Sequence, residues 1–214
     1  MSKVLFTIGH STHSFDYFVG LLGRHGVEVV GDVRSIPYSR RNPQFNRDAL
    51  ELGLRAAGIR YVFLGKELGA RSSNPACYVN GKVQYSCLAR EPLFIDGLQR
   101  VRKGIDSFRV ALMCAERDPL TCHRTILVCK ELKSPEIDIN HILADGALES
   151  NAASERRLTS MMNLVPDMFH TEQDCINQAY DRQAGNIAYT LTPHDSETPI
   201  RDRPDEDIYH RFHQ

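Results

Sequence analysis

Three groups of polar residues follow short apolar runs of the chain, and their side chains are of the types that bind ligands or catalyse reactions. They are His10 and Ser11; Asp32, Arg34 and Ser35; and Cys114, Glu116, Cys122, His123 and Arg124. Imidazole, carboxylate and thiol groups transfer protons or attack electrophiles, whereas guanidinium groups bind phosphate or carboxylate. The residue types therefore predict a catalytic or ligand-binding pocket, provided that the fold brings the three groups together.

The second group continues into an arginine-rich segment, residues 32–48, which has no acidic residue between Asp32 and Asp48. We expect its guanidinium groups to hold an anionic ligand in pairs of hydrogen bonds. The candidates are Arg34, Arg40 and Arg41, with Tyr38 and Phe45 interleaved as rings that could stack on a base. The alternative is a solvated surface loop whose arginines pair with acidic residues elsewhere.

The third group lies in the segment 114–124, whose sequence is CAERDPLTCHR. Asp118 and Pro119 predict the start of a helix that runs to about residue 132, with Cys122 in or just after its first turn. A helix N-terminus favours a thiolate, so we expect catalytic roles for Cys122, Glu116 and His10. The alternatives are that Cys114 and Cys122 are small core residues and that His10 only binds the loop backbone.

The cysteine spacing argues against a metal. A metal site built from Cys114, Cys122, His123 and His10 is conceivable, but the spacing Cys-x7-Cys-His does not match a structural zinc pattern such as C-x2-C. No metal site is therefore predicted, and the cofactor is left unknown. The string DVR at residues 32–34 is similar to rhodanese-like sequences. Neither cysteine frame, however, has the arginine that closes the phosphate loop of such enzymes: Pro119 and Leu120, or Leu127 and Val128, stand there.

Strand and helix patterns alternate along the first two thirds of the chain. Strands are predicted at 3–8, 27–31, 60–64, 108–113 and 137–142, and helices at 14–25, 46–57, 92–104, 118–132 and 172–189. Such alternation is typical of βαβ units. We therefore predict an α/β fold, a Rossmann-like three-layer sandwich with a mostly parallel sheet and a C-terminal helical extension.

The domain organisation follows from the change of character near residue 145. Residues 1–145 are predicted to form the α/β core domain, with an insertion at 65–92 that is long for a loop. Residues 146–191 form a helical extension packed on the core, and residues 192–214 form a polar, poorly ordered tail. Ligands bind beyond the carboxyl ends of parallel strands, which is where the three polar groups fall.

Composition limits the partners. The 214 residues carry a net charge of −1 and have a pI of about 6.7, so a nucleic acid would need a local basic patch. The first residues lack a signal sequence, and no apolar run is long enough for a membrane span. We therefore expect a cytoplasmic protein without a membrane partner, whose six cysteines are thiols or ligands more often than disulfides. The oligomeric state is left open.

Four motifs resemble domain-of-unknown-function family 488. They are TIGHST at 7–12, DVRSIPYSRRNPQFN at 32–46, GIRYVFLGKELGAR at 58–71 and CAERDPLTCHR at 114–124, and QAYDRQAGNIAY at 178–189 is similar to the closing helix of that family. One departure is Ala70, where the family often has a second glycine. The resemblance implies the α/β fold and a shared pocket built by these motifs, but no reaction.

Three hypotheses about function remain. The leading one is an enzyme of unknown reaction class that acts on a phosphorylated or nucleotide-like anion. Its ligand-binding residues would be Ser11, Asp32, Arg34, Ser35, Arg40, Arg41, Cys114, His123 and Arg124. The second is a nucleic-acid-binding module without catalysis that uses the loop 34–47. The third is a metal- or redox-sensing protein that uses Cys114, Cys122 and His123.

Overall fold

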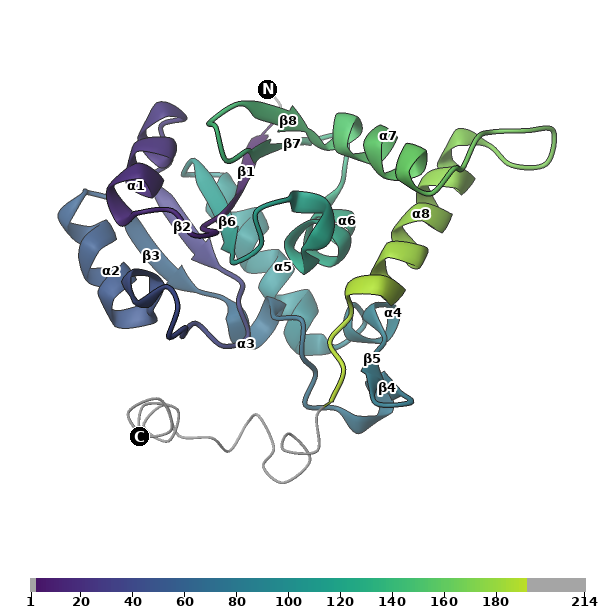
Figure 1. The fold of residues 1–214 in the computed structure, drawn as a ribbon, viewed down its shortest axis with the longest axis horizontal. Helices are drawn as coiled ribbons and strands as arrows, with labels where there is room; N and C mark the ends of the chain where they lie inside the picture. The colour runs from purple at the N-terminus through teal and green to yellow at the C-terminus, as the bar shows by residue number, and fades with distance from the viewer. Residues whose placement is uncertain (1–2, 192–214) are drawn as a thin grey trace.

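The computed structural model describes residues 3–191 and places six strands in one sheet. The strand order is β3-β2-β6-β1-β7-β8, and all neighbours are parallel except β7 and β8 (Figure 1). The strands are β1 (Lys3–Gly9), β2 (Val29–Asp32), β3 (Arg60–Phe63), β6 (Val110–Cys114), β7 (Ile137–Ile142) and β8 (Leu148–Ser150). The five parallel strands are those that the apolar runs predict, so the α/β, Rossmann-like class is confirmed.

Helices cover both faces of the sheet, which gives three layers. They are α1 (Phe15–Arg24) and α2 (Arg47–Ala56) on one face, and α5 (Pro92–Ile105), η4 (Arg124–Cys129) and α6 (Lys130–Leu132) on the other. The sequence sets the ends of α1: the Ser14 side chain accepts a hydrogen bond from the N–H of Tyr17, and Gly26, with φ of +60°, follows the helix.

Side chains along β6 alternate between the two faces. Val110, Leu112 and Cys114 belong to the apolar cluster beneath α5 and η4, whereas Ala111 and Met113 belong to the cluster beneath α1 and α2. A strand covered on both faces needs apolar residues at every position, and this explains the uninterrupted run. Cys114, the last residue of β6, therefore faces the layer that contains η4.

The predicted insertion, residues 65–92, folds into short elements. They are α3 (Gly65–Leu68), the turn η2 (Pro75–Cys77), β4 (Tyr78–Val79), β5 (Lys82–Val83) and α4 (Tyr85–Leu88). β4 and β5 form an antiparallel hairpin, and Cys77 before it forms a disulfide with Cys87 after it. The expectation of thiols or ligands is therefore wrong for these two cysteines, because the hairpin brings their Cα atoms to 5.3 Å, a disulfide spacing.

The helix predicted from Asp118 begins later than expected. Asp118 caps only the short turn η3 (Pro119–Thr121), by accepting a hydrogen bond from the N–H of Leu120 at 2.9 Å. Cys122 is then extended, with φ of −130° and ψ of 138°, and the helical chain of η4 and α6 starts at Arg124. The expectation that Cys122 lies in or after the first turn is corrected: an extended residue interrupts the helix, and Cys122 precedes it.

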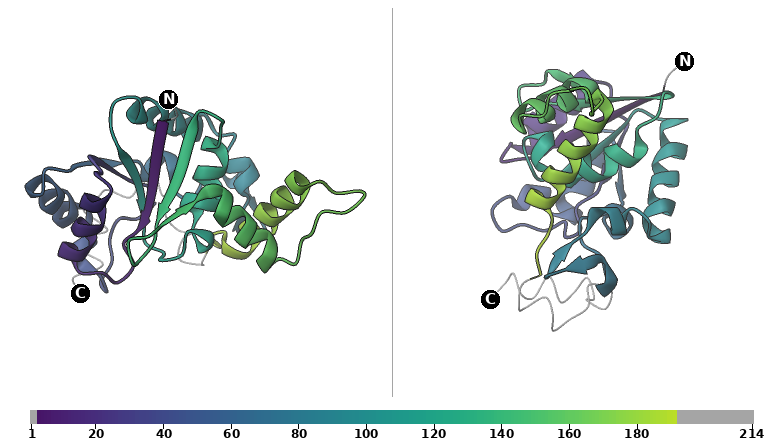
Figure 2. Two further views of the ribbon diagram at one scale, coloured as in Figure 1. Left: turned by 90° about the horizontal axis from the view of Figure 1, so that it is seen from above. Right: turned by 90° about the vertical axis from the view of Figure 1, so that its right-hand side faces the viewer.

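The chain after residue 145 adds a strand and two helices. β8 extends the main sheet, and α7 (Asn151–Met161) and α8 (Glu172–Ile187) follow, joined by a loop that projects from the molecule (Figure 2). The sequence predicts the helix that α8 forms but not β8, and the structure adds that Thr171 caps α8 in a capping box with Asp174. Among the described residues, every helix is too short or too polar to cross a membrane. The predicted tail, residues 192–214, lies outside the described residues.

Candidate functional site

β6 lies where the connections of the sheet change direction. The chain leaves β1 and β2 toward α1 and α2 on one face, but it leaves β6 toward η4 on the other. β6 also lies directly between β1 and β2, with Cys114 opposite Gly9 and Met113 opposite Asp32. In open parallel sheets, ligands bind beyond the strand ends at such a switch point. The three polar groups of the sequence meet at this edge.

One cluster at this edge, the Asp32–Arg34 cluster, consists of these two residues with His10 and Tyr61. The Asp32 carboxylate accepts hydrogen bonds from two nitrogens of Arg34, at 2.9 and 2.6 Å, and from the Tyr61 hydroxyl at 2.9 Å. Arg34 also donates to the carbonyl of Phe45 at 2.8 Å. The Asp32 and Arg34 side chains are 0% and 6% exposed. The protein itself therefore uses most donors of Arg34, which holds the loop to the strand end.

His10 completes this cluster as a neutral imidazole. Its Nδ1 donates to the carbonyl of Ser11 at 2.9 Å, and its Nε2 accepts from Arg34 at 3.2 Å. The ring stacks on Phe45 with 4.4 Å between centroids. Burial, and next the positive charge of Arg34, lower the pKa of His10 to about 4. Both ring nitrogens thus have partners inside the protein.

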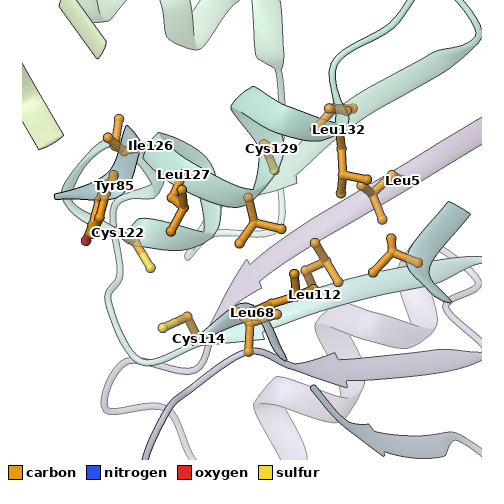
Figure 3. Close-up of a cluster of buried hydrophobic side chains, with 14 of the residues drawn as sticks. Leu5, Leu68, Tyr85, Leu112, Cys114, Cys122, Ile126, Leu127, Cys129 and Leu132 are labelled. Atoms are coloured by element: carbon orange, nitrogen blue, oxygen red, sulfur yellow. The ribbon is translucent and has the colours of Figure 1, made fainter. Parts of the chain in front are cut away.

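The second cluster, the cysteine cluster, consists of Cys114, Glu116, Cys122, His123 and Arg124. Oε2 of Glu116 lies 3.0 Å from the sulfur of Cys114 and 2.9 Å from that of Cys122. Nδ1 of His123 lies 3.7 and 4.0 Å from the same two sulfurs. Both sulfurs point into the space between β6 and the start of η4 (Figure 3). Two thiols, an imidazole and a carboxylate therefore share one small volume.

The donor atoms have the spacing of a metal site. The two sulfurs and Nδ1 of His123 all lie within 4.8 Å of one another. Zinc bonds of ordinary length in a tetrahedron separate sulfur from nitrogen by about 3.5 Å and two sulfurs by about 3.8 Å. Nε2 of His123 donates to the carbonyl of Val33 at 2.9 Å, so in the neutral imidazole the lone pair is on Nδ1, which faces the sulfurs. Metal-binding histidines are oriented in this way.

Arg124 is the most deeply buried charge in the cluster, at 0% exposure. Its guanidinium donates to the carbonyls of Glu116 and Arg117, at 2.7 and 3.4 Å, while its Nε has no hydrogen-bond partner within residues 3–191. In that range it also has no carboxylate at ion-pair distance. A buried cation needs a counter-charge. Burial lowers the pKa of the guanidinium, but Cys122, whose sulfur also accepts a hydrogen bond from the backbone N–H of Arg124 at 3.5 Å, raises it.

The surroundings shift the pKa values of the two thiols in opposite directions. Burial raises the pKa of both; for Cys114 the neighbouring Cys122 adds to this effect. For Cys122 the hydrogen bond with Cys114 and the charge of Arg124 outweigh burial, so its pKa lies below the usual value. Burial and the nearby Cys122 raise the pKa of Glu116. The cluster therefore holds a proton that Cys122 gives up easily and Glu116 can accept.

The remaining predicted residues are peripheral to both clusters. Ser11, with φ of +48°, binds the carbonyl of Ala115 through its N–H at 2.9 Å. Ser35 is half-buried against Gly69, while Arg40 and Arg41 are exposed. The loop 32–48 thus divides into a buried anchor at Arg34 and an exposed part.

The roles of Tyr61, Val33 and Gly9 were not predicted from the sequence. Tyr61 and Val33 act through a hydroxyl and a backbone carbonyl, for which the sequence carries no signal. Gly9 does carry one, because a glycine directly after a buried strand often marks a close backbone approach. A Cβ atom on Gly9 would lie 1.9 Å from the carbonyl oxygen of Glu116. Glycine is therefore needed here to seat the segment that carries the cysteine cluster.

Comparison with known proteins gives one result. The chain matches the family Domain of unknown function DUF488 over residues 14–130, a range that contains Arg34 and the whole cysteine cluster. No curated protein and no solved structure matches the chain. Because the match covers more than half of the sequence, the protein belongs to the family Domain of unknown function DUF488.

Proposed function

We propose that the protein is an enzyme whose reactive centre is a thiophilic divalent metal ion of the zinc class, held by Cys114, Cys122 and His123. One observation carries this proposal: the three donor atoms lie within 4.8 Å of one another, and the hydrogen bond to Val33 turns Nδ1 of His123 toward the sulfurs. The donors come from the end of β6 and the residues before η4, which is why their spacing in the sequence does not match a zinc knuckle.

The charges of the cluster support a bound dication. Two thiolates and the Glu116 carboxylate carry three negative charges, whereas Arg124 supplies one positive charge. A divalent ion brings this sum to zero and supplies the counter-charge that the two buried thiolates need. Three protein ligands leave a fourth position open, which is the arrangement of catalytic zinc sites. Glu116, whose Oε2 already lies within 3.0 Å of both sulfurs, would exchange protons with a molecule in that position.

The substrate that we propose is a small anionic molecule, such as a phosphorylated or nucleotide-like compound. The geometry gives the arginine loop a smaller part than its composition suggests, because Arg34 is bound to Asp32 and Phe45 is buried beneath His10. For the same reason a nucleic-acid-binding module has less support: of the arginines singled out in this loop, only Arg40 and Arg41 are exposed.

A dithiol redox centre is the second candidate. Cys114 and Cys122 are both free, and both sulfurs contact the same oxygen of Glu116. Loss of two protons and two electrons to an oxidant would join the sulfurs as a disulfide.

Cobalt(II) binding separates the two candidates. We expect purified protein to bind one equivalent of cobalt(II) with the absorption of sulfur-to-metal charge transfer, and Cys122→Ser to lose most of the affinity and the sulfur signal. Cys129→Ser is the matched control, because Cys129 is a buried cysteine in η4 outside the donor set. Absence of stoichiometric binding would contradict the metal proposal. A disulfide between Cys114 and Cys122 after mild oxidation would then favour the redox centre.

A further inference from the structure

A groove of about 390 Å³ opens between α4, the helical chain of η4 and α6, and α8. Figure 1 shows α4 and α8 side by side at the end of the molecule away from α1 and α2. Its volume is in the range of small-molecule pockets. Neither cluster of the sheet edge lines it directly, so its relation to the cysteine cluster depends on the side chains between them.

The inner wall of the groove is also the wall of the cysteine cluster. Tyr85, Ile126 and Leu127 line the groove and pack in the same apolar cluster as Cys114 and Cys122. In Figure 3 the ring of Tyr85 lies beside Cys122, at the end of η4 that faces the sulfurs. Tyr85 thus lines the groove and also lies near the two thiols.

Tyr85 is the distinctive member of this layer. It is 7% exposed, and its hydroxyl has no hydrogen-bond partner among the residues that the structure describes. Burial raises the pKa of Tyr85 beyond its usual range, and the negative charges of Cys122, Cys114 and Glu116 add to this effect. The hydroxyl is therefore close enough to the cluster to feel its charge, and it is free to bond an arriving molecule.

The rim of the groove carries more positive than negative charge. Lys82, Arg90 and Lys130 line it together with Glu131 and Asp181. Lys130 pairs with Asp181 at 3.1 Å, and Lys82 donates to the carbonyl of Gly185 at 2.9 Å. Arg90 is exposed, and its guanidinium has no hydrogen-bond or ion-pair partner in residues 3–191. The side of the groove next to α4 thus offers a cation to an anionic molecule.

We propose that this groove is the binding site and the route of access for a small anionic substrate, and that Tyr85 closes it from Cys114 and Cys122. The inference rests on the proposed function, since it names the path to the same thiols. The other path runs past Glu116, which is exposed. There the carboxylate covers both sulfurs and repels an anion, so the groove is the favoured route.

Alkylation of the thiols by iodoacetate tests the route without any metal. In the full chain, purified without added metal and without reductant, the Cys122 or Cys114 thiolate displaces iodide, and mass spectrometry locates the product. Gly185→Phe places a ring in the groove, because a Cβ atom on Gly185 meets nothing within 4 Å. We expect this variant to react several-fold more slowly and Tyr85→Ala several-fold faster than the unchanged protein. Gln173→Phe, which adds the same ring at the exposed start of α8, should react normally.

Charge and folding are controlled separately. Arg90→Glu should slow iodoacetate more than the neutral iodoacetamide, since only the first is an anion. Cobalt(II) binding of Gly185→Phe shows whether the variant has kept its cluster, so a failed metal site and a failed route give different results. Alkylation rates that are unchanged in both Gly185→Phe and Tyr85→Ala would overturn the proposal. They would indicate that the reagent reaches the thiols from the surface at Glu116. Equal effects of Arg90→Glu on both reagents would overturn the preference for anions.

Discussion

The two clusters at the carboxyl edge of the sheet are both buried, but only one of them satisfies its own charges. In the Asp32–Arg34 cluster the guanidinium faces a carboxylate at 2.6 Å, and both nitrogens of His10 are bonded. In the cysteine cluster Arg124 contacts carbonyls, and its Nε is unpartnered within residues 3–191. We therefore interpret the first cluster as a structural element that holds the loops at the edge of the sheet in place. The second has donors and charge that a bound ion or substrate would complete.

Removing the carboxylate charge of the first cluster should have the largest effect. Asp32→Asn leaves Arg34 buried without its counter-ion, and breaking a buried pair in this way costs about 3–5 kcal/mol of unfolding free energy. Urea denaturation measures the loss. Asp138→Asn, on an exposed part of β7, is the control and should change little. A loss below about 1 kcal/mol for Asp32→Asn would remove the structural role that distinguishes this cluster.

Metal should act on the second cluster alone. Zinc at about a hundredfold excess over its dissociation constant should raise the unfolding free energy by about 2.7 kcal/mol, because it binds only the folded state. A chelator should reverse the gain. Denaturation with and without zinc checks this in the unchanged protein and in Cys114→Ser, which should lose the gain, and in Cys129→Ser, which should keep it. An equal gain in Cys114→Ser would place the metal elsewhere.

Acid should lower the unfolding free energy, and part of this loss should come from His10 in the first cluster. The folded state lowers the pKa of His10 to about 4, mainly by burial and then by Arg34, with Asp32 opposing and Arg124 adding to the shift. The unfolded chain binds this proton near pH 6.5. The full contribution of His10 to the unfolding free energy is therefore present above that pH, and it falls as the pH drops toward 4. At pH 5 the loss is about 2 kcal/mol for such a histidine.

Urea titrations between pH 7 and 5 test this expectation. His141, on β7, has the same lowered pKa of about 4 and should contribute equally to the loss of unfolding free energy in acid. His10→Gln should therefore halve the slope of unfolding free energy against pH rather than abolish it. His170→Gln, at an exposed histidine, should keep the slope of the unchanged protein. An unchanged slope in His10→Gln would show that the ring is not held neutral.

The sheet was predictable because its two central strands, β1 and β6, are mostly apolar runs. VALMC in β6 fills both faces, and the polar residues begin just past the end of that strand, at Glu116. The pairing of Asp32 with Arg34 also had a signal, since residues two apart at a strand end lie on the same side. Gathering three polar groups at one edge followed from parallel topology alone.

The contents of the two clusters were not predictable in the same way. Nothing in the sequence says that β6 lies between β1 and β2, and it is this order that places His123 against the carbonyl of Val33. The approach of Cys114 to Cys122 and His123 depends instead on how residues 115–121 fold back after β6. The helix start moved because the extended backbone of Cys122 overrides the cap at Asp118. Tyr85 and the Cys77–Cys87 disulfide depend on a hairpin inside a segment without clear periodicity.

Two positions at this edge of the sheet have room only for glycine. A Cβ atom on Gly9 would lie 1.9 Å from the carbonyl oxygen of Glu116, and one on Gly65 would lie 2.0 Å from that of Arg34. In both places the obstacle is backbone, which cannot rotate away as a side chain can. A complete mutational scan would therefore find that residues 9 and 65 accept only glycine, even though neither residue has a functional group. At both positions the missing side chain leaves room for a backbone carbonyl group, and the placement of both clusters depends on this space.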